Sequence, residues 1–169
     1  TLGMVLVIVL DKKIKAPASV SSTILEVGGN RDIEAALDRA IEKKDSIGGI
    51  IECSIASLPA GLGEPFFDSI ESVLSHMVFS IPAIKGIEFG AGFAAAKMTG
   101  SEHNDNIVAQ DGSTETNFAG GINGGISNGN EICFRVAVKP TSSTHQTQHT
   151  MNIASGRMED LSIEGRHDV

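Results

Sequence analysis

An apolar stripe with helical spacing lies between two β-branched runs, and it restricts the chain to folds that combine helices with strands. The stripe lies within residues 28–49, where Asn30 can cap the helix, and the runs on either side are residues 18–27 and 48–57. Five apolar side chains recur at i, i+3, i+4, i+7 and i+8, which places them on one helix face. They are Ile33, Ala36, Leu37, Ala40 and Ile41.

A second amphipathic helix is predicted over residues 66–81, because Pro65 suits the first turn of a helix. Residues 81–98 predict a short strand, a glycine turn and a further strand, and residues 131–138 predict the last strand. The polar stretch 99–121 has no periodicity and predicts a long loop. The apolar side chains on one side of the second helix are Phe66, Ile70, Val73, Leu74 and Met77.

The order strand–strand–helix–strand–helix–strand predicts an α+β fold, with two helices packed on a mainly antiparallel sheet. With 169 residues the chain is long enough for one domain, and we expect residues 1–169 to form it. The apolar run at residues 2–10 predicts a buried strand. Because the chain opens at Thr1 within this run, we expect it to be a segment of a longer protein.

Charge and composition exclude several classes of partner. The net charge of −8 argues against nonspecific binding to nucleic acid or to anionic membranes. The run at residues 2–10 is too short to span a bilayer. Cys53 and Cys133 each lie in an apolar, strand-like run, which is typical of buried thiols in a reducing compartment rather than of a disulfide. We therefore expect a cytoplasmic protein.

Five glycines lie within residues 120–129, and two interpretations of them remain open. Glycine adopts backbone angles closed to other residues and lets a flat ligand approach the main chain. The segment matches neither a dinucleotide-binding nor a phosphate-binding P-loop pattern, since a strand follows it and no Gly-Lys-Ser/Thr occurs. An extended turn is the alternative. The glycines are Gly120, Gly121, Gly124, Gly125 and Gly129.

The strand predicted at residues 131–138 runs into the sequence "KPTSS" at residues 139–143. Pro140 cannot donate to a sheet ladder, so the strand ends there or lies at an edge. One ammonium group and three hydroxyl groups then follow in a cluster that suits a phosphate. A polar loop that caps the strand end is the alternative. The donors are Lys139, Thr141, Ser142 and Ser143.

The remaining ionisable candidates give weaker signals. Residues 164–168, "EGRHD", combine anion-binding and acid–base groups but also suit a solvated tail. His145 and His149 are four residues apart, yet their segment is poor helix material and lacks a third ligand, so no metal site is predicted. His76 is expected to be structural, and His103 has no assigned role.

Several stretches, taken together and in order, resemble chorismate synthase. They run from residue 45 to residue 168, and the resemblance corresponds to the middle and later part of that enzyme. It implies a chorismate synthase-like β-α-β sandwich core. It also implies elimination of phosphate from 5-enolpyruvylshikimate 3-phosphate with reduced FMN, in a homotetramer. The matching stretches are "PAGLGEPFFDSIESVLSHMVFSIPAIKGIEFGAGF", "TGSEHND", "NFAGGINGGISNGNEI", "VAVKPTSS" and "EGRHD".

The resemblance also implies a set of site residues. Residues 139–143 would bind FMN, with Lys139 and Ser143 as direct contacts, and Gly124 would lie against the flavin through its backbone. Arg166 would face flavin and substrate, and Asp168 would assist deprotonation through the flavin. The full set of expected FMN contacts is Pro82, Ala83, Gly124, Lys139, Pro140, Thr141, Ser142, Ser143 and Arg166. The glycines and "KPTSS" would thus form two walls of one FMN site.

The chain departs from the family pattern at several points. Many members carry Asn at the position of Pro82, and members continue the "GRHD" motif with Pro-Cys where this chain has Val169. The family's Gly-Glu-Ser-His-Gly motif, its two catalytic histidines and its substrate-binding arginines have no counterpart here. We therefore expect the segment to be inactive alone. Two alternatives are a noncatalytic FMN- or phosphate-binding module and a structural core domain without a ligand.

Overall fold

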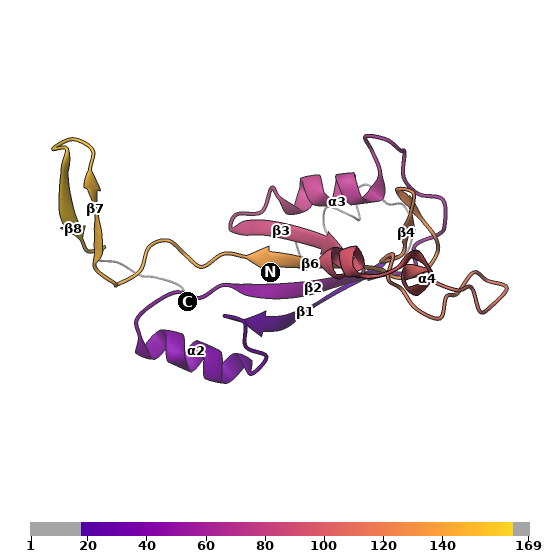
Figure 1. Ribbon diagram of the computed structural model, residues 1–169, viewed down its shortest axis with the longest axis horizontal. Helices are drawn as coiled ribbons and strands as arrows, with labels where there is room; N and C mark the ends of the chain where they lie inside the picture. Colours follow the sequence, from indigo (N-terminus) through magenta and orange to yellow (C-terminus); the bar gives the residue numbers. More distant parts are fainter. Residues whose placement is uncertain (1–17, 164–169) are drawn as a thin grey trace.

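The computed structural model describes residues 18–163 and has an α+β fold, as predicted. A four-stranded antiparallel sheet with the strand order β1-β2-β6-β3 forms its centre (Figure 1). The strands are β1 (Ser19–Val27), β2 (Gly49–Ala56), β6 (Ile132–Val138) and β3 (Ile84–Phe89). These bounds confirm the strand predictions at 18–27, 48–57 and 131–138. The strand predicted at 2–10 lies outside the described residues.

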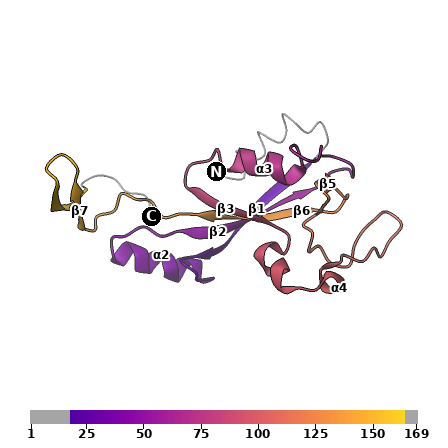
Figure 2. The same ribbon diagram turned by 45° about the horizontal axis from the view of Figure 1, so that its top comes forward.

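The core lies between one face of this sheet and helix α3 (Ile70–Val78), which lies on one side of the sheet in Figure 2. Alternate residues of β6 point to this face because side chains alternate along a strand. Phe134 stands at the centre, only 1% exposed, with its ring centroid 5.6 Å from that of Phe89. The other fully buried members are Cys53, Ile55, Val78, Ile132 and Val136.

Helix α3 begins four residues later than its predicted start at Phe66. Ser69 is its N-cap and accepts a hydrogen bond from the backbone N–H of Ser72 at 3.2 Å. The preceding residues form a turn in which Glu64 and Asp68 exchange two backbone hydrogen bonds of 2.9 Å. Phe66 is therefore not on the buried side of the helix; it is 93% exposed. The prediction for Ile70 and Leu74 is confirmed, since both are buried.

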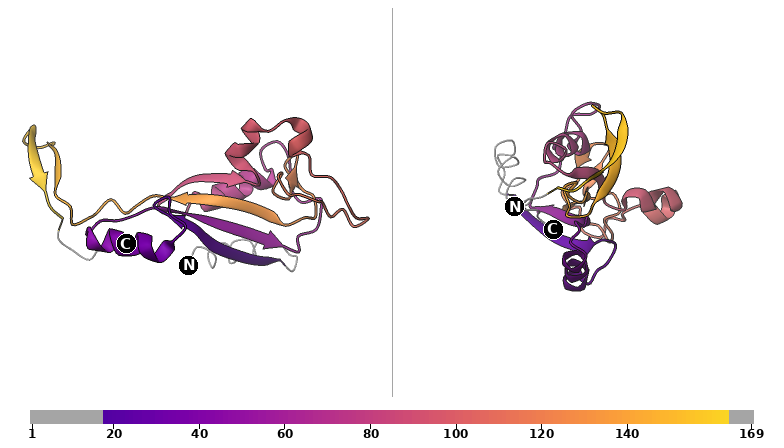
Figure 3. Two further views of the ribbon diagram at one scale, coloured as in Figure 1. Left: turned by 60° about the horizontal axis from the view of Figure 1, so that its bottom comes forward. Right: turned by 90° about the vertical axis from the view of Figure 1, so that its left-hand side faces the viewer.

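Helix α2 (Ile33–Glu42) lies beside the β1 edge of the sheet (Figures 1 and 3). Asp32, rather than Asn30, caps it by accepting a hydrogen bond of 3.1 Å from the N–H of Ala35. Only the two alanines of the predicted stripe, Ala36 and Ala40, are fully buried, and Ile41 is 58% exposed. The helix therefore buries a narrower face than its apolar pattern predicts.

The strand predicted after the glycine turn of residues 90–92 is wrong. A 3₁₀ helix, η1 (Gly92–Lys97), and a short helix, α4 (Gly100–His103), occupy this region. Gly90 and Gly92 have positive φ angles of 53° and 55°, which end β3, and the alanine-rich sequence that follows favours a helix over a strand. Figure 3 shows both helices on the opposite side of the sheet from α3.

The sequence after "KPTSS" forms a β-hairpin. It consists of β7 (Gln148–Asn152) and β8 (Arg157–Leu161), and it projects from the body of the molecule (Figure 1). His149 lies on β7 and contacts the Asp160 carboxylate at 2.8 Å across the two strands, so its spacing from His145 is not helical. Among residues 18–163 no group of His, Cys, Asp and Glu could hold a metal ion.

Both cysteines are free thiols. Cys53 is fully buried in the core, whereas Cys133 is only partly buried on the other face of the sheet. Burial, with smaller contributions from Cys133 and Glu52, raises the pKa of the Cys53 thiol to about 11. This thiol therefore stays protonated and unreactive near neutral pH. Within the described part of the chain, no helix has the length and apolar character needed to cross a membrane.

Candidate functional site

The "KPTSS" segment leaves the sheet at the end of β6 and gathers polar groups around one ammonium. Lys139 is half-buried, and its Nζ donates hydrogen bonds to the Ser142 Oγ at 2.9 Å and to the Pro140 carbonyl oxygen at 3.1 Å. An ammonium has three N–H donors, so one remains for a further acceptor. Ser142 and Thr141 are exposed, while Ser143 is half-buried. This donor set, one cation with neighbouring hydroxyls, fits a phosphate monoester.

The structure brings the predicted Ala83 next to this cluster. The backbone N–H of Lys139 donates to the Ala83 carbonyl oxygen at 2.9 Å, and Pro82 immediately precedes it. Ala83 has a φ angle of +71°. This left-handed conformation is energetically unfavourable for any residue that carries a side chain. No local pattern in the sequence predicts this backbone conformation.

Two further contacts hold the "KPTSS" segment against the loop between α2 and β2. The Ser46 hydroxyl donates to the Thr141 carbonyl oxygen at 2.6 Å, and the Gln146 side-chain amide donates to the Lys43 carbonyl oxygen. Thr144 follows and is buried, only 8% exposed. The segment is therefore fixed at both of its ends rather than free.

The glycine-rich segment forms a tight hairpin from β4 (Ile122–Asn123) and β5 (Ile126–Ser127). Gly124 and Gly125 are its two turn residues, with φ angles of 58° and 85°, as a type I′ turn requires. A Cβ atom on Gly125 would lie 2.7 Å from the Cβ of Ser69, so there is no room for a side chain or a ligand at this position. A Cβ on Gly124 would meet no atom within 4 Å. The turn and the ligand-binding interpretations are thus compatible. The segment is a tight turn, and it leaves the backbone at Gly124 open to a flat ligand.

Asp105 organises the long loop that precedes this hairpin. Its carboxylate accepts hydrogen bonds from the Thr116 hydroxyl and the Phe118 N–H, both at 2.7 Å, and from the Ala119 N–H at 2.9 Å. Partial burial raises the pKa of Asp105, but these three bonds and the nearby His103 outweigh it and hold the pKa below its ordinary value. The ionised Asp105 side chain therefore holds the segment that leads into the glycines. The sequence patterns above did not predict this role.

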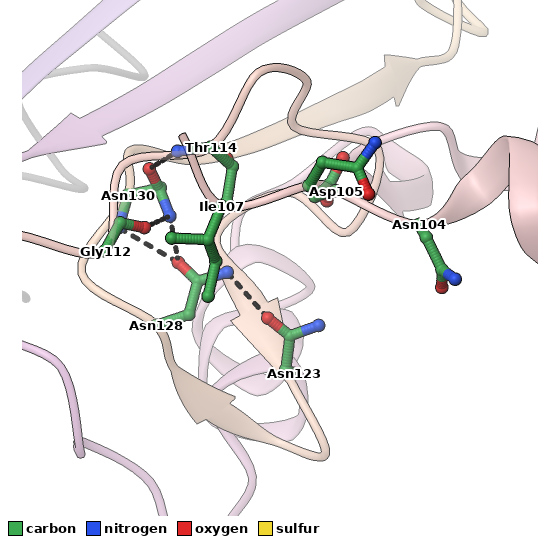
Figure 4. Close-up of a pocket in the computed structure, with 9 residues that line it drawn as sticks. Asn104, Asp105, Ile107, Gly112, Thr114, Asn123, Asn128 and Asn130 are labelled. Carbon is green, nitrogen blue, oxygen red and sulfur yellow. Dashed lines mark hydrogen bonds between the residues drawn. The ribbon is translucent and has the colours of Figure 1, made fainter. Parts of the chain in front are cut away.

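An open cavity of about 520 Å³ lies between this loop and the glycine hairpin (Figure 4). Three amides line one wall in a chain: Asn123 accepts from Asn128 at 2.6 Å, and Asn128 accepts from Asn130 at 3.1 Å. Ile107 contributes an apolar side chain. No Lys, Arg or His lines this cavity among the described residues, so its chemistry suits amide or hydroxyl groups rather than a phosphate.

An ion pair braces the sheet beside the glycine hairpin. The Arg135 guanidinium lies 3.0 Å from Glu88 and donates to the Gly90 carbonyl oxygen at 3.1 Å. The second Glu88 oxygen accepts from the Phe93 N–H at 3.0 Å. The pair therefore fixes the turn between β3 and η1, and Arg135 is engaged with protein groups rather than free for a ligand.

The structure does not bring all predicted site residues together. Lys139, Ala83 and Ser142 form one cluster after the end of β6. Gly124 lies in the turn between β4 and β5, and β4 lies near the other end of the sheet (Figure 1). The two walls predicted for one FMN site are thus at opposite ends of the sheet within this chain. Arg166 and Asp168 lie outside the described residues.

Comparison with known proteins shows the family of this chain. A sequence model of chorismate synthase matches residues 4–169. The chorismate synthase of Chitinophaga pinensis is 61% identical over 170 residues, which cover 100% of this chain and 51% of that relative. The chorismate synthase of Opitutus terrae is 52% identical over 126 residues, which cover 73% of this chain and 34% of that relative.

A solved structure gives the same result. A crystal structure of chorismate synthase superimposes with a TM-score of 0.71 at 26% identity, covering 84% of this chain and 54% of that one. The chain therefore spans about half the length of the Chitinophaga pinensis relative and of the solved structure.

Proposed function

The chain belongs to the chorismate synthase family, and on that premise we propose that it supplies part of the site of a chorismate-forming enzyme. The reaction is a trans-1,4 elimination of phosphate and a proton from 5-enolpyruvylshikimate 3-phosphate, which makes the enzyme a carbon–oxygen lyase. It works in the cytoplasm as a homo-oligomer, a tetramer in the family. The observation that supports this proposal best is the Lys139 cluster at the end of β6.

The Lys139 cluster would hold the phosphate of FMN. The Lys139 ammonium would neutralise negative charge, while Ser142 and Ser143 would donate hydroxyl hydrogen bonds. Pro140 and Thr141 would shape the loop between them. The backbone of Pro82 and Ala83 would border the same pocket, since Ala83 accepts from the Lys139 N–H. The net charge of −8 makes a local cation necessary for binding an anion.

The open surface of Gly124 would lie against the isoalloxazine ring. A ring can approach the main chain there because nothing lies within 4 Å of the position a Cβ would take. When bound, reduced FMN supplies electron density to the substrate as its phosphate leaves. The protein's part is to position the two molecules, exclude water and stabilise the departing anion.

Arg166 and Asp168 complete the proposed residues. Arg166 would face the flavin and the carboxylates or phosphate of the substrate, with the planar donor geometry that suits such anions. Asp168 would accept a proton by way of the flavin, as the family pattern implies. Both proposals come from the resemblance of "EGRHD" to the family motif.

Replacing Lys139 by alanine should weaken FMN binding about 10- to 100-fold. A hydrogen bond to a charged group contributes about 1.5–3 kcal/mol, and each 1.4 kcal/mol corresponds to a factor of ten. Quenching of flavin fluorescence during titration with the protein would measure the dissociation constant. Ser142, which now accepts from Lys139, would remain able to donate to the phosphate and limit the loss.

Lys97→Ala is the matched control, because it removes the same charge from an exposed position on η1. We expect it to leave the dissociation constant within about twofold, since an exposed charge acts only through screened, long-range interactions. Equal weakening by both variants would show that net charge alone governs binding and would contradict the proposed phosphate site.

A further inference from the structure

Two asparagines of the glycine-rich segment are each followed directly by a glycine. They are Asn123, before Gly124, and Asn128, before Gly129. In an Asn-Gly pair the backbone nitrogen of the glycine can attack the side-chain carbonyl carbon of the asparagine, because no side chain on the glycine hinders the approach. The attack leads to replacement of the amide by a carboxylate without an enzyme. In a folded chain, the rate depends on how firmly the structure holds the pair.

Asn123 is loosely held. It is exposed, and the hairpin of β4 and β5 has only two residue pairs, of which Asn123 with Ile126 is the one beside the turn. Among the described residues its side chain has one hydrogen-bond partner: its Oδ1 accepts from the Asn128 Nδ2 at 2.6 Å. The Asn123 Nδ2, which is the group that would leave, points away from Asn128 (Figure 4). The side chain can therefore turn toward Gly124 at the cost of one hydrogen bond.

Gly124 presents the attacking nitrogen to solvent. The residue is exposed, and a Cβ atom built on it would meet nothing within 4 Å, so there is room for a ring to close. Within residues 18–163, no backbone carbonyl accepts a hydrogen bond from the Gly124 N–H. The proton on this nitrogen can therefore pass directly to water or hydroxide.

Asn128 is held more firmly. It is half-buried, and its Oδ1 accepts from the Asn130 backbone N–H at 2.9 Å and from the Asn130 Nδ2 at 3.1 Å. With the bond to Asn123, its side chain makes three hydrogen bonds. Its backbone N–H also donates to the Gly121 carbonyl oxygen at 3.0 Å. Because a backbone N–H can only donate, Asn130 fixes which oxygen and nitrogen of Asn128 face which partner.

We infer that Asn123–Gly124 is a site of spontaneous modification, in which Asn123 becomes aspartate or isoaspartate while Asn128 is spared. The Gly124 nitrogen forms a bond to the Asn123 Cγ and loses its proton to solvent. The bond from Cγ to Nδ2 breaks, and the amide group takes up a proton and leaves as ammonia. Water then opens the five-membered succinimide ring at either of its carbonyls. The net change is the gain of one water and the loss of one ammonia.

The product would add a negative charge to the wall of the amide cavity. Asn123 lines this cavity, and in the described part of the chain Asp105 is the one acidic residue that lines it. A carboxylate at position 123 could still accept from the Asn128 Nδ2, but it would disfavour an anionic ligand nearby. The isoaspartate product would also lengthen the backbone beside the turn by one carbon atom. The inference goes beyond the proposed function and does not depend on it.

Isotope labelling tests the inference. The folded wild-type chain is incubated in heavy-oxygen water at mildly alkaline pH, and tandem mass spectrometry locates the label, which enters when water opens the ring. We expect the label at Asn123 at about ten times the rate at Asn128, because the Asn128 side chain has two more hydrogen bonds to break. In urea, where the fold is lost, the two rates should become similar.

Asn123→Gln is the matched variant, because its longer side chain would have to close a six-membered ring, which is much slower. It should lose the label at position 123 and keep the slow rate at Asn128. Isoaspartate among the products identifies the ring, since direct hydrolysis gives aspartate alone. The inference would be overturned by equal rates in the folded chain, by faster reaction at Asn128, or by aspartate without isoaspartate at position 123. A tenfold difference that persisted in urea would also overturn it, because local sequence rather than structure would then select Asn123.

Discussion

Replacing Asp105 by alanine is expected to lower the free energy of unfolding by about 3–4 kcal/mol. The carboxylate accepts three hydrogen bonds of 2.7–2.9 Å, two of them from backbone N–H groups of Phe118 and Ala119. A hydrogen bond to a charged group contributes about 1.5–3 kcal/mol, and the three are not fully additive because they share one side chain. Urea unfolding followed by circular dichroism measures the change; the chain has no Trp or Tyr for fluorescence.

Asp111→Ala serves as the control for this prediction. Asp111 is exposed and accepts one backbone hydrogen bond, from Ser113 at 3.0 Å, so its removal should destabilise the chain far less than removal of Asp105. If the two variants lost equal stability, Asp105 would not be the anchor of the loop.

The effect of Asp105 should also depend on pH. Its folded-state pKa is lower than its unfolded value of about 4. The ionised carboxylate therefore contributes its stability above pH 4, and this contribution is lost as the pH falls through the lower folded-state pKa. The stability difference between the wild-type chain and Asp105→Asn should shrink over that range, and a constant difference would contradict the assigned role.

Replacing Phe134 by alanine should have a comparable or larger effect, a loss of about 3–5 kcal/mol of unfolding free energy. Phe134 is 1% exposed on β6, which pairs with both β2 and β3, and its ring packs on Phe89. Its removal leaves a cavity that strands paired on both sides cannot close. The same urea unfolding experiment measures this loss.

Phe93→Ala is the matched control for the core substitution. It removes the same side chain from a position that is 84% exposed on η1, so we expect a change within about 0.5 kcal/mol. A loss at Phe93 as large as the loss at Phe134 would show that the described core does not determine the stability of the chain.

The sheet could be predicted from sequence because its signals are local. The β-branched runs at 18–27, 48–57 and 131–138 each became a strand. The helix predicted from Pro65 began later because Ser69 offers a better cap than the residues before it. The strand predicted near residue 92 failed because two glycines of positive φ end β3 there.

The candidate site was only partly predictable because its contacts join residues that are far apart in the sequence. Asp105 binds residues 11 to 14 positions away through side-chain hydrogen bonds, which leave no periodic pattern in the sequence. Gly124 and Lys139 are close in sequence but are separated by a straight strand, so nearness along the chain does not make them neighbours in space. The pairing of Lys139 with Ala83 depends on the β3–β6 register, which sequence alone did not define.

The most direct test of the proposed function is a chimera with the Chitinophaga pinensis relative. This chain would replace the matching stretch of 170 residues in that chorismate synthase, with which it is 61% identical. With reduced FMN and 5-enolpyruvylshikimate 3-phosphate, we predict formation of chorismate, and a strong loss of it at low FMN when Lys139 is replaced by alanine. A folded chimera that binds FMN but forms no chorismate would contradict the account.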